Sequence, residues 1–376
     1  MIKKIIMMMS AAVAMVCVQA ATEKVNGITW NYTVSGVTNL VTSADGLAAL
    51  QAAIEASNEG DVILVGPGTY SPIRTNGKKI TIKSTDGAAN TIIDGGYTNR
   101  CATLADDTMG DWWLGDWAED QYVEYTPPSP YNTTLIGFTL CNGKSYWKGH
   151  VEYYEDGSQE NILPSRAFEG GGAFGGVLVD CVVSNNVAEF IFEKGSIYYE
   201  TDEETGEMVL EVQAEDDSEA RGGGVSFAKL YNCLVTENKA TIGGSGIDNC
   251  YAYNCTIVGN YCETREEDDF DDVFDVENSE IYNTIMSVTP YWGGGYAMDV
   301  GDVKAEGCAI VSETGSALPY NYFNECWNGN GDIYSYDFIV GDMKFVNPSI
   351  GDYRLQQGSV AIDAGNEAVL QNRARA

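Results

Sequence analysis

The chain contains a single histidine, His150, in the sequence Lys148-Gly-His150-Val151. Histidine is the usual general base of a nucleophilic triad, so any triad of that kind would depend on this one residue. A zinc site is also not indicated, because no Cys-x-x-Cys pair is present. We therefore predict that His150 is a surface loop residue, and the sequence singles out no catalytic residue.

Carboxylates are concentrated in two stretches, residues 190–220 and 262–277, which hold 11 and 9 of the 55 acidic residues. The second stretch could supply oxygen ligands for calcium, which takes about six to eight of them. The candidate ligands are Asp268, Asp269, Asp271 and Asp272. Because the run lacks the Asp-x-Asp-x-Asp-Gly spacing of a dedicated calcium loop, we favour a solvated acidic loop. Calcium is the alternative, and no cofactor is required.

Aromatic side chains form the second group with binding chemistry, because the apolar C–H face of a sugar ring can stack on them. They lie mainly between the regular segments described below. The candidate glycan contacts are Trp112, Trp113, Trp117, Trp147, Tyr153, Tyr154, Trp292 and Trp327. The alternative, which we favour for any single one of them, is a small satellite core that holds a long loop in place.

The charge and the first residues limit the partners. A net charge of −34 would repel phosphate backbones, so nucleic-acid binding is not expected. Residues 1–20 read as a secretory signal peptide, with a basic start, an apolar run and a cleavage site after Ala20. A lipoprotein anchored through Cys17 is the less favoured alternative, since Val16 occupies a place where a small residue is expected. No later apolar run is long enough to span a membrane, so we expect a secreted or cell-surface protein.

A short motif recurs along the rest of the chain. In its three best copies an asparagine follows a cysteine by five residues, and two of these copies lie 22 residues apart. The inward positions expected to stack are Phe138, Cys181, Cys233, Cys255, Thr284 and Cys308, and the corner positions are Asn186, Asn238 and Asn260. Apolar residues alternate within each copy, which indicates short strands. Because one such unit cannot bury its apolar face alone, we predict stacked coils of a parallel β-helix.

The repeat defines the expected organisation. Residues 21–44 should form an N-terminal strand or cap, 45–366 the parallel β-helix, and 367–376 a tail. Leu47, Leu50 and Ile54 have helical spacing, so a helix should cap the open end of the coil. Long insertions are expected at about 103–131, 144–168, 190–220, 262–277 and 316–337, and residues 196–212 should form a hairpin. Insertions at equivalent positions should project from one side.

Nine cysteines remain after signal cleavage, so at least one is unpaired. The stacked cysteines should be reduced and buried, because side chains that point the same way disfavour the disulfide dihedral. Two bridges are possible candidates by position: Cys250 with Cys262, and Cys101 with Cys141.

Three features together resemble the right-handed parallel β-helix (pectin-lyase-like) superfamily: residues 60–70, the Asn-Cys rungs, and the ending 345–365. The glycine-rich rungs are also similar to the repeats of polymorphic outer-membrane proteins, which are bacterial surface proteins. The resemblance covers residues 45–366 and implies an all-β, single-stranded right-handed solenoid. It implies little about function, because this fold carries lyases, hydrolases and adhesins alike.

Two functions follow from the sequence. The favoured one is a non-enzymatic binding or adhesion module whose insertions contact a polysaccharide or a surface protein. The alternative is a polysaccharide lyase or glycoside hydrolase that acts on acidic polysaccharide. Enzymes similar to pectate lyases need an Arg or Lys base, for which Arg100, Lys148, Arg166 and Arg221 are available. An inverting hydrolase needs two carboxylates about 6.5–9.5 Å apart, and the sequence identifies no such pair.

Overall fold

The structure is a computed structural model. It describes residues 19–25, 28–34, 39–106, 130–148, 150–153, 159–162, 169–191, 196–201, 208–213, 220–240, 244–262, 275–288, 303–306, 308–312, 342–348, 352–362 and 364.

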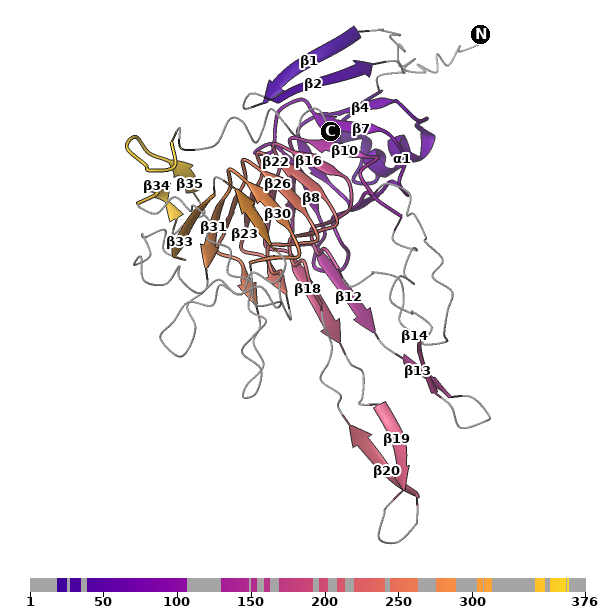
Figure 1. The fold of residues 1–376 in the computed structure, drawn as a ribbon. Coiled ribbons are helices and arrows are strands. Elements are labelled where there is room, and N and C mark those ends of the chain that lie inside the picture. The colour runs from indigo at the N-terminus through magenta and orange to yellow at the C-terminus, as the bar shows by residue number, and fades with distance from the viewer. Residues whose placement is uncertain are drawn as a thin grey trace, which may run out of the picture.

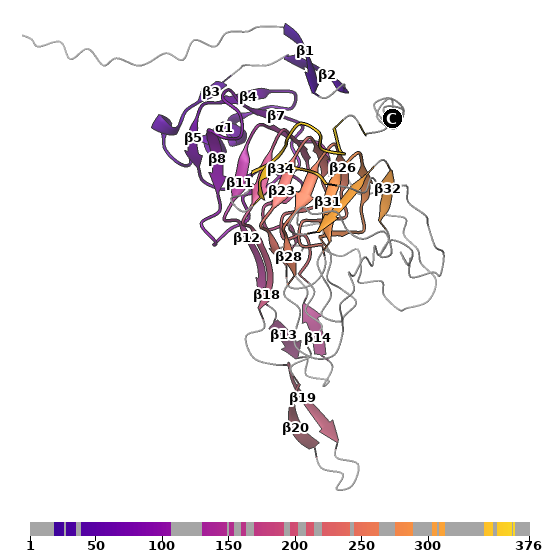
Figure 2. The same ribbon diagram turned by 90° about the vertical axis from the view of Figure 1, so that its left-hand side faces the viewer.

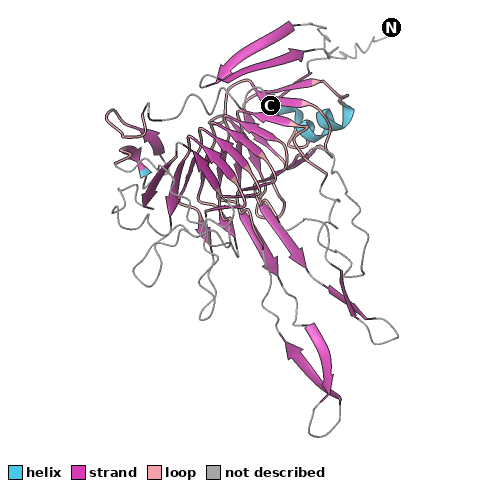
Figure 3. Cartoon of the chain, viewed as in Figure 1, coloured by secondary structure: helices cyan, strands magenta, loops and turns pink. Residues whose placement is uncertain are grey.

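The described strands wind into a parallel β-helix, which confirms the predicted architecture (Figures 1 and 3). Successive coils add parallel strands to three long sheets. The nine-stranded sheet contains β3 (Asn39–Val41), β4 (Val62–Val65), β7 (Thr81–Ser84), β10 (Thr134–Ile136), β16 (Val177–Val179), β22 (Lys229–Tyr231), β26 (Tyr251–Tyr253), β30 (Glu280–Tyr282) and β32 (Lys304–Glu306). The eight-stranded sheet contains β5 (Gly68–Tyr70), β8 (Thr91–Asp94), β11 (Thr139–Cys141), β17 (Val182–Ser184), β23 (Leu234–Thr236), β27 (Thr256–Val258), β31 (Ile285–Val288) and β33 (Ala309–Ser312). The six-stranded sheet contains β6 (Ile73–Arg74), β9 (Ala102–Thr103), β15 (Ala173–Phe174), β21 (Val225–Ser226), β25 (Ile247–Asp248) and β29 (Val276–Glu277).

A fourth, shorter parallel sheet leads out of the coil. It contains β12 (Lys144–Lys148), β18 (Val187–Ile191), β24 (Lys239–Ala240) and β28 (Tyr261–Cys262). Antiparallel hairpins follow β12 and β18 in the chain: β13 (His150–Tyr153) with β14 (Gln159–Ile162), and β19 (Ser196–Thr201) with β20 (Met208–Gln213). Figures 1 and 2 show these strands on one side of the coil. His150 therefore begins a hairpin strand, where a loop was expected.

The core consists of straight rows of apolar side chains, because the same strand position points inward in every coil. Leu178 pairs in register with Leu135 and Leu230 in the nine-stranded sheet. Val183 pairs likewise with Leu140 and Val235 in the eight-stranded sheet. These side chains are fully buried in one continuous cluster.

Left-handed residues turn the chain from one sheet to the next. Between the nine- and eight-stranded sheets they are Asp180, Asn232, Asn254 and Asn283, with φ between 49° and 55°. The corner that leads to the four-stranded sheet has Asn142, Asn185 and Glu237 in the same conformation. Asparagine and aspartate tolerate positive φ better than other residues with a side chain, which explains why the repeat carries them.

A second asparagine, one residue further on, lies inside the corner. Asn186 donates from Nδ2 to Oδ1 of Asn238 at 2.8 Å, and Asn238 donates in the same way to Asn260 at 2.9 Å. All three are buried, so the row pairs polar groups that would otherwise lack water. The structure also buries the six residues expected to stack inward: Phe138, Cys181, Cys233, Cys255, Thr284 and Cys308.

The two candidate disulfides are not formed, since Cys101, Cys141 and Cys250 are free. The Cys101 thiol instead donates to the carbonyl oxygen of Cys141 at 3.1 Å, and burial raises the pKa of this thiol far above its ordinary value. Cys250 likewise donates to the carbonyl oxygen of Asp248 at 3.2 Å. Both thiols thus bond to oxygen acceptors, which for Cys101 also include Oδ1 of Asn186 at 3.5 Å.

Helix α1 (Ala49–Ala56) buries Leu50 and Ile54 against the first coil, as their spacing predicts. Leu47, the third residue of the predicted face, instead precedes the helix and is exposed. A short 3₁₀ helix, η1 (Ser43–Asp45), precedes it. The Lys78 ammonium group caps α1 by donating to the carbonyl oxygens of Ile54, Glu55 and Ser57 at 2.8, 3.0 and 3.1 Å. A cation is favourable there because the last carbonyls of a helix carry partial negative charge.

Replacing this lysine tests how much the cap contributes. We expect Lys78→Met to lower the free energy of unfolding by about 1–3 kcal/mol, because three carbonyl groups lose a charged donor. Urea denaturation measures the change. Lys79→Met is the matched control, since Lys79 is an exposed neighbour, and it should change stability by less than about 0.5 kcal/mol. Equal midpoints for the two variants would show that the cap contributes nothing.

Two antiparallel pairs complete the described chain. At the N-terminal end β1 (Gln19–Val25) pairs with β2 (Ile28–Val34). At the C-terminal end β34 (Phe345–Asn347) and β35 (Asp352–Leu355) place Met343 and Phe345 against Val258 and Ile285 of the eight-stranded sheet. No helix in the described ranges is long and apolar enough to span a membrane.

Candidate functional site

The outer face of the six-stranded sheet carries a continuous row of side chains. Each of its strands has two residues, of which the first points into the core and the second points outward. In register, the outward residues are Arg74, Thr103, Phe174, Ser226, Asp248 and Glu277. The row therefore begins with a cation at the N-terminal coil and ends with two acids.

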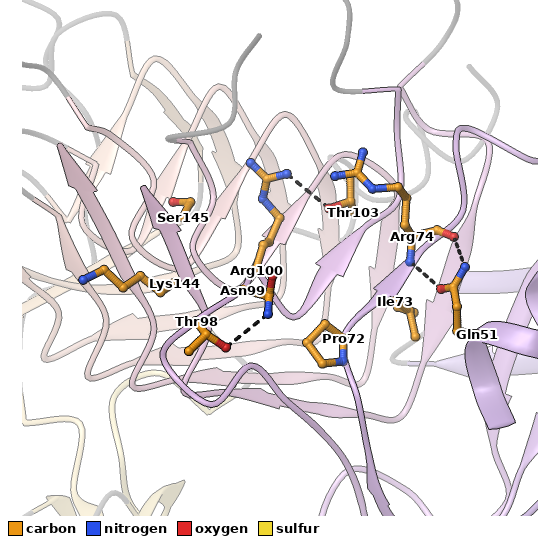
Figure 4. A pocket seen from close by; sticks show the side chains of 10 residues that line it. All are labelled: Gln51, Pro72, Ile73, Arg74, Thr98, Asn99, Arg100, Thr103, Lys144 and Ser145. Atoms are coloured by element: carbon orange, nitrogen blue, oxygen red, sulfur yellow. Dashed lines mark hydrogen bonds between the residues drawn. The ribbon is translucent and has the colours of Figure 1, made fainter. Parts of the chain in front are cut away.

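A pocket of about 360 Å³ opens at the cationic end of this row (Figure 4). It lies where helix α1, the six-stranded sheet and the start of β12 meet. Its lining residues are Gln51, Pro72, Ile73, Arg74, Thr98, Asn99, Arg100, Thr103, Lys144 and Ser145. Three of these residues are cations, and no acid lines the pocket within the part of the chain that the structure describes.

Arg100 is the fixed cation of the pocket and is only 8% exposed. Its Nε donates to the carbonyl oxygen of Gly170 at 2.9 Å, and its Nη2 donates to that of Glu169 at 2.5 Å. Nη1 donates to Oγ1 of Thr103 at 3.2 Å, and the guanidinium lies 5.0 Å from the centre of the Phe174 ring. These contacts hold the positive charge in one place.

Arg74 supplies a second guanidinium beside Thr103, with which it pairs in register, and its side chain is exposed (Figure 4). Its main chain is held by Gln51 of helix α1. The Arg74 amide donates to Oε1 of Gln51 at 2.8 Å, and Nε2 of Gln51 donates to the Arg74 carbonyl at 3.2 Å. The helix that caps the coil thus also positions one wall of the pocket.

Lys144 forms the other end of the pocket. Its amide donates to the carbonyl oxygen of Asn99 at 2.9 Å, which joins the segment before β9 to the start of β12. Its ammonium group forms an ion pair with Glu189 of the neighbouring strand β18. The carboxylate lies outside the pocket lining, so Lys144 presents a partly compensated charge to a ligand.

The charges make this pocket unusual for the chain. The protein carries 55 acidic residues and 21 basic ones, yet three of the basic ones converge here. Contact electrostatics act over a few ångströms, and the charge of remote acids is screened beyond about 10 Å at 0.1 M salt. The pocket can therefore attract an anionic group, and guanidinium pairs suit a carboxylate in particular.

The acidic end of the row has a different character. Glu277 forms an ion pair with Arg221, while Asp248 accepts hydrogen bonds from Asn278 at 3.0 Å and Asn249 at 2.9 Å. Both carboxylates are buried. Arg221, one of the cations considered for a lyase, is thus engaged in holding coils together. Asp248 and Glu277 are not an accessible carboxylate pair of the kind a hydrolase needs.

Most of the side chains proposed from the sequence lie outside the described residues. These are Trp112, Trp113, Trp117, Tyr154, Trp292, Trp327, Asp268, Asp269, Asp271 and Asp272. Trp147 and Tyr153 belong to described strands, but their side chains do not belong to the described part. The described residues contain no group of three or more His, Cys, Asp or Glu that could hold a metal ion. Glycan contact and calcium binding at these positions stay predictions.

The sequence offered Arg100 as one of four available basic residues without selecting it, and it did not point to the two cations that meet it. Arg74 and Lys144 are 70 residues apart and belong to different sheets. The repeat gives the place of each within its own coil, but not which coils become neighbours. Arg74 follows the inward Ile73 of one coil, and Lys144 follows the glycine at the next corner.

No family model and no curated protein matches this chain. Among solved structures, it is similar to the pectate lyase Pel9A, with 11% identity, 86% of this chain and 90% of that chain covered, and a TM-score of 0.32. An alginate lyase from Paenibacillus sp. strain FPU-7 shows 12% identity, 75% and 89% coverage, and a TM-score of 0.29. A pectin methylesterase in complex with a hexasaccharide shows 10% identity, 79% and 86% coverage, and a TM-score of 0.31. The parallel β-helix is established by the sheet topology of this chain itself.

Proposed function

We propose that this protein acts on an acidic polysaccharide and that the pocket binds the carboxylate of a uronate unit. The observation that carries the proposal is the meeting of Arg74, Arg100 and Lys144 in a pocket whose described lining residues include no acid. In a chain with a net charge of −34, such a site selects for an anionic ligand at close range. Thr98 and Asn99, which are exposed, supply polar groups for sugar hydroxyls.

The reaction we propose is cleavage by β-elimination. It removes the proton on C5, next to the uronate carboxylate, forms a double bond between C4 and C5, and expels the glycosidic oxygen on C4, which takes up a proton from water. The step therefore needs neutralisation of the carboxylate and a base that accepts the C5 proton. The two cations that stay charged supply the neutralisation, since charge that develops on the carboxylate is stabilised by donors already in place. Within the described part of the pocket, the base has to be the uncharged form of the third cation. Hydrolysis is less favoured, because the described residues of the pocket lining include no pair of carboxylates.

Binding without cleavage is the second candidate. It is favoured by the contacts of the two inner cations: Arg100 is held by main-chain carbonyls, and Lys144 is paired with Glu189. Groups fixed in this way suit recognition of an anion. In this case the protein is a secreted or cell-surface module that holds acidic glycans.

One experiment separates these functions. The mature chain is incubated with polygalacturonate, alginate and hyaluronate, and with a neutral glucan as control, with calcium and again with chelator. Ultraviolet absorbance from unsaturated uronate indicates elimination, and new reducing ends without that absorbance indicate hydrolysis. Retarded migration in gels that contain an acidic polysaccharide, without any product, indicates binding alone. If acidic polymers are neither cleaved nor bound, the proposed function is wrong.

The exposed cation gives the sharpest test of the site. Arg74→Gln should weaken affinity for acidic oligosaccharides about 10- to 100-fold, because a charge-assisted hydrogen bond contributes about 1.5–3 kcal/mol. Titration calorimetry measures the change. Arg354→Gln is the matched control: it removes the same charge from β35, where Arg354 pairs with Asp352. If the two variants bind equally well, the carboxylate does not bind at Arg74.

A further inference from the structure

Tyr97 is an exposed aromatic residue in a conformation that disfavours it. Its φ is 56°, and its side chain is 46% exposed. A residue with a bulky side chain costs about 1–2 kcal/mol in the left-handed region. Such strained positions persist where the surrounding contacts hold them, and they cluster at binding sites.

Contacts from two further coils hold the residue. The Tyr97 amide donates to the carbonyl oxygen of Asn142 at 2.6 Å, and Nδ2 of Asn185 donates to the Tyr97 hydroxyl. Asn185 also donates to Oδ1 of Asn142 at 2.8 Å, and Asn142 donates to Oδ1 of Asp94 at 3.1 Å. The ring is therefore pinned at both ends beside a row of polar side chains, with its apolar surface accessible to a ligand.

The pinned ring adjoins the pocket. Residues 97–99 run beside residues 142–144: Tyr97 bonds to Asn142 at one end, and Lys144 donates to the carbonyl of Asn99 at the other. Asn99 and Lys144 line the pocket, whereas Tyr97 and Asn142 lie just beyond it. Tyr97 and Asn99 are two residues apart, so their Cα atoms lie at most about 7 Å from each other, which brings the ring within reach of a sugar unit linked to one in the pocket.

We propose that Tyr97 is the stacking platform of a second sugar subsite, next to the carboxylate pocket, which rests on the proposed function. The apolar face of a pyranose would lie on the ring, and the amides of Asn142 and Asn185 would meet its hydroxyl groups. The platform needs no charge on the sugar. The two subsites together therefore recognise a chain of linked units in which the unit in the pocket is a uronate.

The experiment compares uronate oligosaccharides of one to four units by titration calorimetry. Three variants are used: Tyr97→Gly, which suits the positive φ; Tyr97→Phe, which keeps the ring and removes the hydroxyl; and Tyr261→Ala. Tyr261 is the control, since it is 55% exposed but lies on β28, at the far edge of the four-stranded sheet. Thermal melting checks each fold, and Tyr97→Gly should melt no lower than the wild type because glycine relieves the strain.

Tyr97→Gly should weaken binding of two or more units about 5- to 10-fold, leave the single uronate unchanged, and keep the salt dependence of the wild type. Tyr97→Phe should lose no more than about threefold. Suppose that Tyr97→Gly and Tyr261→Ala bind oligosaccharides of every length with the same affinity, while Arg74→Gln binds them weakly. Then the proposed platform is wrong, and the proposed carboxylate pocket is still supported. If the wild type binds none of the oligosaccharides, the pocket and the platform are both wrong.

Discussion

Ile257→Asp is expected to abolish folding. Ile257 is fully buried at the centre of β27, in register with Val235 and Met286 of the coils on either side. An aspartate there would have to remain charged without water or be protonated, and either costs several kcal/mol. The total stability of a domain is only about 5–15 kcal/mol. The defect would also pass to both neighbouring coils, since each coil is packed between two others.

Thr256→Asp is the matched control, since Thr256 is the preceding residue on the same strand and points outward. It should leave the fold intact, with a change below about 1 kcal/mol. Circular dichroism and the yield of soluble protein measure both variants. Should Ile257→Asp melt like the wild type, the inward register of the eight-stranded sheet described above is wrong.

Asn238→Ala is expected to lower the free energy of unfolding by about 3–5 kcal/mol. The Asn238 side chain accepts from Nδ2 and the amide of Asn186 at 2.8 and 3.1 Å, and it donates to Asn260 and to the Val183 carbonyl at 2.9 and 3.0 Å. Each buried partner left without a hydrogen bond costs about 1–3 kcal/mol. Urea denaturation measures the loss.

The neighbouring residue supplies the control for this second prediction. Glu237 is exposed and has a φ of 56°, so Glu237→Gly should be neutral or stabilise the protein by up to about 1 kcal/mol. A midpoint for Asn238→Ala within experimental error of the wild type would show that water or a relaxed neighbour replaces the amide, and that the row adds no stability.

The architecture could be predicted because short sequence segments determine each coil and recur along the chain. A left-handed corner favours asparagine and an inward strand position favours a small apolar residue, so the same residue types recur at each coil. The capping helix could be predicted for a similar reason, because Leu50 and Ile54 have helical spacing on one apolar face. The cysteine bridges were wrong, because spacing alone does not show whether two side chains face each other or stack in parallel.

The pocket could not be predicted, because it depends on which coils become neighbours. Arg74 and Lys144 meet only after the intervening 69 residues have wound through the coil. Lys78 shows the same limit: nothing in its sequence neighbourhood connects it with the carbonyls of α1. The positive φ of Tyr97 is also invisible in the sequence, since aromatic residues seldom adopt it.

The number of residues between neighbouring asparagines of the row indicates how far the molecule would lengthen under tension. Asn186 and Asn238 are neighbours in space but 52 residues apart in the chain, whereas Asn238 and Asn260 are only 22 apart. A force applied at the two ends peels a solenoid one coil at a time. At about 3.5 Å per extended residue, one coil releases about 180 Å of chain and the next about 77 Å. A coil that contains a long insertion thus releases more chain when it unfolds than a coil without one. Under load, the protein is therefore expected to extend in steps of strongly unequal length.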